Sequence, residues 1–144
     1  MKLSKNFDSS EFACPCCGKS NIAPELIIKL QQLRDEIGEP IYVTSGVRCA
    51  GYNKGIGGYS NSPHIEGLAA DIQVSGMTPI TLANMARSIC YIRLGIYPNH
   101  LHVDIVPPHP SHFWLVQKYG GQYIYSKKEK DLAKFLDKEG QKIC

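Results

Sequence analysis

The chain has 144 residues, of which 43% are hydrophobic and 20% are charged, and this length suits one globular domain rather than two. Its formal net charge of +3 is smaller than the basic excess typical of a nucleic-acid-binding domain, so we expect no nucleic-acid partner. No apolar run reaches the ~20 residues of a membrane-spanning helix, and the first residues lack the apolar segment of a secretory signal peptide. We therefore expect residues 1–144 to form a single domain that has no membrane span or signal peptide and is a monomer.

The first half of the chain contains one clear helix and one short strand. Pro24 opens the helix and Gly38 ends it, because the apolar side chains between them recur at helical spacing while charged residues occupy the other face. Residues 41–44 are rich in β-branched and aromatic side chains and predict a strand. Residues 50–63 contain four glycines and two serines, which predicts a long irregular loop, and such a loop in a compact domain is usually functional.

In the second half, strands and helices alternate. A buried strand is predicted at residues 69–74 and a helix from Thr78 to about Cys90. Two short strands follow at residues 93–97 and 100–106, joined by a turn at Pro98-Asn99. A basic helix is predicted at residues 127–138. The proline-rich residues 107–110 end the regular pattern before that last helix. These elements predict an α+β fold in which helices flank a small, mostly antiparallel sheet.

The five histidines all lie between positions 64 and 112, and the first of them is close to an acidic residue. His64 and Asp71 are seven residues apart, with small residues between them and a predicted strand beginning near Ala69. Gly67 permits a tight turn, so the chain can fold back and bring the two side chains to one point.

A second polar group lies on the predicted strand at residues 100–106. Because side chains on a strand alternate, His100, His102 and Asp104 share one face, while the apolar residues between them point into the core. Two histidines and one carboxylate, with water as the fourth ligand, form a common catalytic zinc shell that suits hydrolysis of a peptide or amide bond. The alternative is a set of ordinary loop and strand histidines, but the combined spacing favours a metal site on the sheet.

The chain has six cysteines, and Cys14, Cys16 and Cys17 cluster near its start. Cys49 directly follows Arg48, so a cysteine knuckle docked there would brace the neighbouring loop. A structural zinc ion needs four ligands, and Cys14, Cys17 and Cys49 supply three obvious ones. A second metal site, a disulfide and free thiols remain open for this cluster.

Several short motifs together resemble the zinc D-Ala-D-Ala carboxypeptidase family, which includes murein D,D-endopeptidases and phage endolysins within the wider lysostaphin, D-Ala-D-Ala peptidase and hedgehog metallopeptidase group. The motifs are Thr44-Ser45-Gly46-Val47-Arg48, Asn53, Gly57-Gly58, Ser62-x-His64-x-x-Gly67-x-Ala69-x-Asp71, Gly95-x-Tyr97 and His102-Val103-Asp104. The resemblance covers about residues 7–106, and the motif that runs from Ser62 to Asp71 is highly specific.

The resemblance implies a role for each matching position. His64, Asp71 and His102 match the three zinc ligands of the family. Arg48 matches an arginine that binds the substrate or polarises its scissile carbonyl, which suits a planar and permanently charged guanidinium. His100 matches a histidine that assists the zinc-bound water or stabilises the oxyanion.

Further positions have weaker assignments. Ser62 and Tyr97 lie in the same motifs and are expected to contact the substrate, while Asp104 is expected to orient a ligand histidine. Several members of the family have an acidic general base three positions before the last zinc histidine, but here that position is Asn99, which cannot accept a proton. The base is then His100 or Asp104, or the site is weakened.

From these assignments we expect a zinc metallopeptidase that uses a zinc-activated water to hydrolyse D-amino-acid-containing peptide bonds of peptidoglycan stem peptides or cross-links. One zinc ion is catalytic, and the cysteines leave a second, structural ion as an option. The enzyme would be made in the cytoplasm and reach the cell wall by phage-type lysis, as part of a virion, or by another export route. The rival function, favoured by Asn99, is a non-catalytic zinc-binding cell-wall or virion-associated module. His109 and His112 lie outside the motifs and are expected at the surface.

Overall fold

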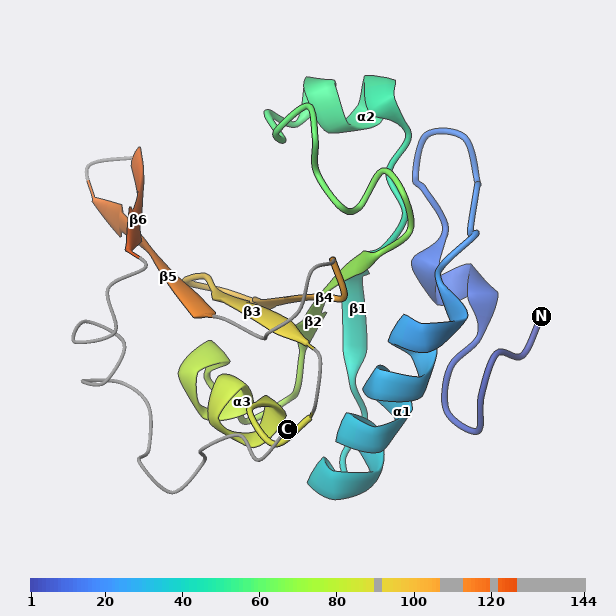
Figure 1. Cartoon of the computed structure of the whole chain (residues 1–144), viewed down its shortest axis with the longest axis vertical. Helices are drawn as coiled ribbons and strands as arrows, with labels where there is room; N and C mark the ends of the chain where they lie inside the picture. The colour runs from blue at the N-terminus through green and yellow to red at the C-terminus, as the bar shows by residue number, and fades with distance from the viewer. Residues whose placement is uncertain (90–91, 107–112, 120–121, 127–144) are drawn as a thin grey trace.

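The computed structural model describes residues 1–89, 92–106, 113–119 and 122–126 (Figure 1). The elements in chain order are η1 (Ser9–Phe12), α1 (Pro24–Ile37), β1 (Tyr42–Ser45), α2 (Ala50–Gly55), β2 (Ala69–Gln73), α3 (Pro79–Ala86), β3 (Arg93–Ile96), β4 (Leu101–Asp104), β5 (Phe113–Tyr119) and β6 (Gln122–Ser126). The helix predicted at residues 127–138, together with His109, His112, Cys90 and Cys144, lies outside the described residues. Within the described part, no helix is both long and apolar enough to cross a membrane.

The strands form one mixed sheet in the order β1-β2-β4-β3-β5-β6. The first four are antiparallel to their neighbours, whereas β5 runs parallel to β3 and pairs with β6 in an antiparallel hairpin. In the central register Asp71 of β2 lies opposite His102 of β4, and His102 lies opposite Gly95 of β3. The prediction of an α+β fold with a mostly antiparallel sheet is therefore confirmed.

Helices α1 and α3 cover the apolar face of this sheet. Pro24 is the first residue of α1, and Gly38 ends the helix in the left-handed conformation at φ +75°, as the sequence predicted. The buried side chains of α1 and α3 join one core cluster with alternate residues of the strands, namely Ala70, Ile72, Leu94, Ile96, Leu101 and Val103. The helices contact each other as well as the sheet, so the polar residues between those positions face the opposite side.

Three predictions of local structure were wrong. Residues 50–55 form α2 instead of an irregular loop, because the Cys49 side chain caps the helix by accepting a hydrogen bond from the Tyr52 N–H. Helix α3 ends at Ala86, before the predicted end, where a tighter turn begins as the Ile89 N–H donates to the Ala86 carbonyl. The region beyond residue 110 contains β5 and β6, an antiparallel hairpin that was not predicted although two β-rich runs flank Gly120-Gly121 in the sequence.

Gly67 fixes the tight turn between His64 and β2. Its φ is +72°, and a Cβ atom there would lie 2.2 Å from the Asn21 carbonyl oxygen. The Gly67 carbonyl also accepts a hydrogen bond from the Ala23 N–H at 2.8 Å. The segment before α1 therefore touches the backbone of this turn, and only glycine fits both the conformation and the contact.

The comparison of Gly67→Ala with Gly76→Ala tests this interpretation. Both glycines have positive φ, but a Cβ at Gly76 would meet no atom within 4 Å. Gly76→Ala should therefore lower the free energy of unfolding by about 1 kcal/mol, the cost of the left-handed conformation alone. Gly67→Ala should cost about 1–3 kcal/mol more, because the added methyl group also displaces backbone. Urea unfolding measures both, and equal losses would contradict a close contact at Gly67.

Candidate metal centre

The polar face of the sheet collects the residues that the sequence singled out. Asp71 lies on β2 between buried apolar neighbours, and His102 lies opposite it on β4. His64 comes from the loop before β2, where the turn at Gly67 brings it back over the strand. All three side chains are buried, and Asp104, two residues after His102, has no exposed surface.

His64, Asp71 and His102 converge on one point. One carboxylate oxygen of Asp71, Oδ1, lies 3.2 Å from His64 Nε2 and 3.1 Å from His102 Nδ1. One potential ligand atom from each of the three residues lies within 4.8 Å of the others. Zinc ligands at ~2.0–2.2 Å from a shared ion have separations within this limit, so the spacing fits a metal site.

Hydrogen bonds at the far side of each ring determine which nitrogen faces this point. His64 Nδ1 lies 2.7 Å from the Gly46 carbonyl oxygen, so it must carry the proton and donate it. His102 Nε2 likewise donates to Asp104 Oδ2 at 2.7 Å. The remaining nitrogen of each ring then directs a lone pair at the Asp71 carboxylate. A proton or a metal ion shared with Asp71 relieves the repulsion between these electron pairs, and two nitrogens with one carboxylate oxygen suit zinc.

The ionisation states agree with this arrangement. In the metal-free protein, burial raises the pKa of Asp71, but hydrogen bonds that the His102 and His64 rings donate when protonated lower it, so the group remains a carboxylate. Burial lowers the pKa of His102, whereas its contacts with Asp104 and Asp71 raise it, to about 9 overall. Without a metal ion, His102 therefore takes up a proton to satisfy its two carboxylate neighbours.

Arg93 supports the second of these carboxylates, and the sequence analysis missed it. Its guanidinium donates two hydrogen bonds to Asp104, from Nε to Oδ1 and from Nη2 to Oδ2. Burial raises the pKa of Asp104, but the hydrogen bonds from His102 and Arg93 lower it. Arg93 lies opposite Asp104 in the register of β3 and β4. The sequence signal for this contact was its place on the predicted strand, two residues before Gly95 of the family motif.

Arg48 lies directly beside the three candidate ligands. Its Nη2 donates to Asp71 Oδ2 at 3.1 Å, Nε donates to Ser45 Oγ at 2.9 Å, and Nη1 donates to Asn53 Oδ1 at 3.3 Å. The Arg48 backbone N–H also donates to the His64 carbonyl at 3.0 Å. The guanidinium is thus fixed on three sides, and 13% of the side chain remains accessible. Asn53, which the sequence analysis quoted only as part of a motif, is buried and helps to hold it.

His100 is the more open histidine at this centre. It precedes β4, its Nε2 lies 3.7 Å from Asp71 Oδ2, and 28% of its side chain is exposed. The ring stacks on Tyr97, with ring centres 4.5 Å apart. Burial lowers the pKa of His100, so the imidazole is neutral at neutral pH. Ser62, which we expect to contact substrate, lies at the His64 backbone, whose N–H donates to its Oγ at 3.3 Å.

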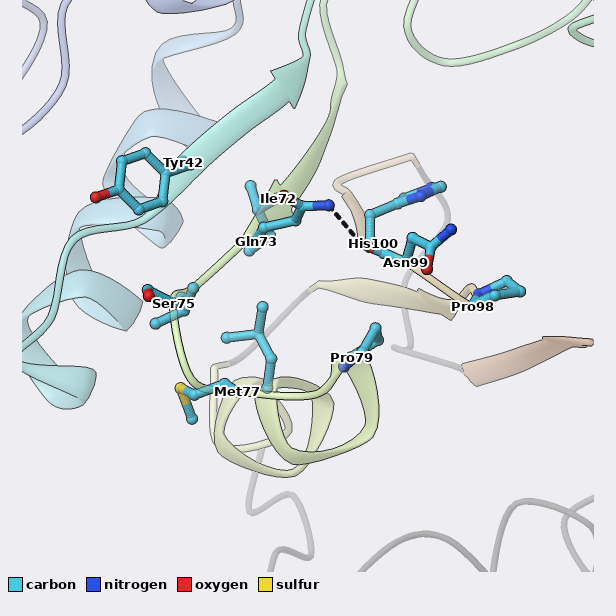
Figure 2. A pocket seen from close by; sticks show the side chains of 11 residues that line it. Tyr42, Ile72, Gln73, Ser75, Met77, Pro79, Pro98, Asn99 and His100 are labelled. Carbon is cyan, nitrogen blue, oxygen red and sulfur yellow. Dashed lines mark hydrogen bonds between the residues drawn. The ribbon is translucent and has the colours of Figure 1, made fainter.

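A pocket of about 440 Å³ lies beside this centre, at the end of β2 and the start of α3 (Figure 2). None of the three candidate metal ligands lines it, but Asn99 and His100 do. The Gln73 side chain crosses the pocket to donate to the Asn99 carbonyl at 2.5 Å. Figure 2 shows the His100 ring pointing away from Met77 at the pocket floor. His100 therefore lines this pocket and also lies beside Asp71 of the candidate metal centre.

Comparisons with known proteins agree with the geometry. Residues 5–105 match the model of the peptidase M15 family. The zinc D-Ala-D-Ala carboxypeptidase of Streptomyces albus G is 36% identical over 95 residues, which are 64% of this chain and 37% of that protein. The chain thus spans well under half the length of this relative.

The hydrogen bond between His102 and Asp104 makes a prediction for the metal-free protein. By nuclear magnetic resonance, the His102 ring should titrate with a pKa of about 9, and Asp104→Asn should shift that pKa down towards ~6.5. Because the folded pKa is raised, the charged ring stabilises the fold fully below the unfolded value of ~6.5, and this stability is lost as pH rises through about 9. A His102 pKa near ~6.5 in the wild-type metal-free protein would contradict the assigned ring orientation.

Proposed function

The chain belongs to the peptidase M15 family, and from this premise we propose that it is a zinc-dependent peptidase whose metal ligands are His64, Asp71 and His102. The observation that carries the proposal is the orientation of the two rings. Gly46 and Asp104 each accept a ring proton, so both remaining lone pairs are directed at the same carboxylate. When bound there, zinc would lower the pKa of a coordinated water and polarise the substrate carbonyl.

Arg48 is the proposed electrophilic partner for the substrate. Its guanidinium is always charged and is held beside Asp71 by Ser45 and Asn53. A fixed cation at this place can bind a substrate carboxylate or stabilise the negative charge that develops on the carbonyl oxygen during hydrolysis. Its fixed position means that little reorganisation is needed when that charge develops.

His100 is the proposed general base and acid. The neutral ring beside Asp71 can accept a proton from the attacking water and later give it to the departing amine. The ring stacks on Tyr97, which supports its orientation. Asn99 has no basic group, and Asp104 is occupied by Arg93 and His102, so His100 is the titratable group best placed for this role among the described residues.

The proposed substrates are peptides with D-amino acids from peptidoglycan, cut either at the terminal residue or at a cross-link. Likeness to the Streptomyces albus G carboxypeptidase supports the first cleavage type. The enzyme would act on the cell wall after release from the cell in which it is made.

The rival function is a zinc-binding module of a cell wall or virion without catalysis. It is favoured by Asn99, because several members of the family have an acidic general base at this position, three residues before the last zinc histidine. The position of His100 beside Asp71 favours catalysis instead. Both functions use the same metal site, and only the first of them includes hydrolysis of a peptide bond.

Digestion of purified muropeptides tests the function directly. The zinc-loaded protein should release D-alanine from pentapeptide stems or convert cross-linked dimers into monomers, and a chelator should abolish either reaction until zinc is restored. Mass spectrometry of the products tells the two cleavage types apart, and His64→Ala serves as the matched inactive control. Zinc-loaded protein that binds muropeptides but leaves every peptide bond intact would identify the non-catalytic module.

His100→Ala should separate catalysis from metal binding. We expect kcat to fall by at least ~100-fold, because general acid–base catalysis contributes that much or more, while zinc content stays unchanged. In the wild type, kcat/KM should decline as pH falls below the lowered pKa of His100, because only the neutral ring accepts a proton, and this decline should disappear in the variant. Wild-type kcat in His100→Ala would exclude the base role, and loss of zinc would make His100 a ligand.

A further inference from the structure

A second cluster of potential metal ligands lies at the other end of the Arg48 segment. The sulfur atoms of Cys14, Cys17 and Cys49 all lie within 4.8 Å of one another. All three are free thiols; Cys14 is buried, Cys49 is half-buried and Cys17 is exposed. A tetrahedral zinc ion with Zn–S bonds of ~2.3 Å holds its sulfurs ~3.8 Å apart, so the cluster needs only side-chain adjustment to bind one.

The backbone around Cys14 is shaped as a tight turn that presents its sulfur to N–H groups. The Gly18 N–H donates to the Cys14 carbonyl at 2.9 Å, Gly18 has φ +75°, and the Cys14 N–H donates to the Lys19 carbonyl at 2.7 Å. The Cys49 N–H donates to Cys14 Sγ at 3.3 Å. Such donors stabilise a thiolate, which is the form of cysteine that binds metals.

Two of the three sulfurs, those of Cys14 and Cys49, accept a hydrogen bond from a backbone N–H group. The sulfur of Cys49 accepts its hydrogen bond from the Tyr52 N–H at 3.5 Å, at the start of α2. Backbone donors therefore reach two of the three sulfurs that converge.

We propose that Cys14, Cys17 and Cys49 bind a second, structural zinc ion, distinct from the ion proposed at His64, Asp71 and His102. Sulfur ligands select a thiophilic ion such as zinc, whereas the nitrogen and carboxylate ligands of the other centre do not require one. The side chain of Cys16 interacts with that of Cys49, which makes it the candidate fourth ligand; its sulfur lies outside the converging group of three and would have to move to bind.

The ion would fasten the amino-terminal segment to the residues that support the candidate active site. Cys14 and Cys17 belong to that segment, and Cys49 is the neighbour of Arg48. Near these cysteines the Val47 N–H donates to the Phe12 carbonyl at 2.9 Å, so the two segments of the chain are already in contact. A metal ion bound to Cys49 would hold the backbone next to Arg48. Two residues before Arg48, the Gly46 carbonyl already orients the His64 ring.

Cadmium titration of the reduced, metal-free wild-type protein tests the proposal. Cadmium bound to thiolates gives a sulfur-to-metal charge-transfer absorption in the ultraviolet, which the nitrogen and oxygen ligands of the other centre cannot produce. The band should saturate at one equivalent of thiolate-bound cadmium, and zinc-loaded wild-type protein should contain two zinc ions per chain. His64→Ala should keep the band, so the result is independent of the proposed peptidase function.

Variants locate the ligands. Cys17→Ser changes an exposed thiol, so the fold is retained, and it should lose the band and one zinc ion while the other ion stays bound. The double variant Cys90→Ser/Cys144→Ser removes two thiols outside the motif and should keep both ions. Absence of the band in reduced wild-type protein would overturn the proposal, as would its persistence at full intensity in Cys17→Ser. A disulfide among these cysteines in protein purified with ample zinc would also overturn it.

Discussion

The two oxygens of the Asp71 carboxylate organise this side of the molecule. Oδ1 faces His64 Nε2 and His102 Nδ1, while Oδ2 faces Arg48 and lies 3.7 Å from His100. A buried carboxylate is costly unless it is paired, and here every neighbour that pairs with it is also a candidate functional group. The need to satisfy one buried charge therefore draws the residues of the proposed centre together, and a metal ion is the partner that satisfies both ring lone pairs.

The fold meets this need through the sheet. Helices α1 and α3 cover one face, so the alternation of β2 and β4 sends Asp71, His102 and Asp104 to the other. The ring nitrogen that faces away from Asp71 has its own partner in each histidine. This partner is the Gly46 carbonyl for His64 and the Asp104 carboxylate for His102, and Arg93 in turn holds Asp104. These anchors fix the ring orientation before any ligand binds, which favours metal affinity because little order is lost on binding.

The sequence predicted those parts of the fold and the candidate site that depend on local pattern. Alternation on the predicted strand assigned the inward and outward residues of β4 correctly, and Gly67 explained how His64 returns towards β2. The parallel contact between β5 and β3 was not predictable, because no local turn joins the two strands. The contact between Arg93 and Asp104 was missed, although the predicted turn at Pro98-Asn99 already places the two residues opposite each other. The helix after Cys49 was missed because cysteine is an unusual cap in a glycine-rich stretch.

The central claim is that His64 and His102 present particular ring nitrogens to a zinc ion shared with Asp71. A crystal structure of the zinc-loaded protein, with anomalous scattering recorded at the zinc edge, measures this directly. We predict a peak ~2.0–2.2 Å from His64 Nε2, His102 Nδ1 and an Asp71 oxygen, with His102 Nε2 still donating to Asp104. A peak bound through His102 Nε2, or zinc found only at the cysteine cluster, would contradict the account.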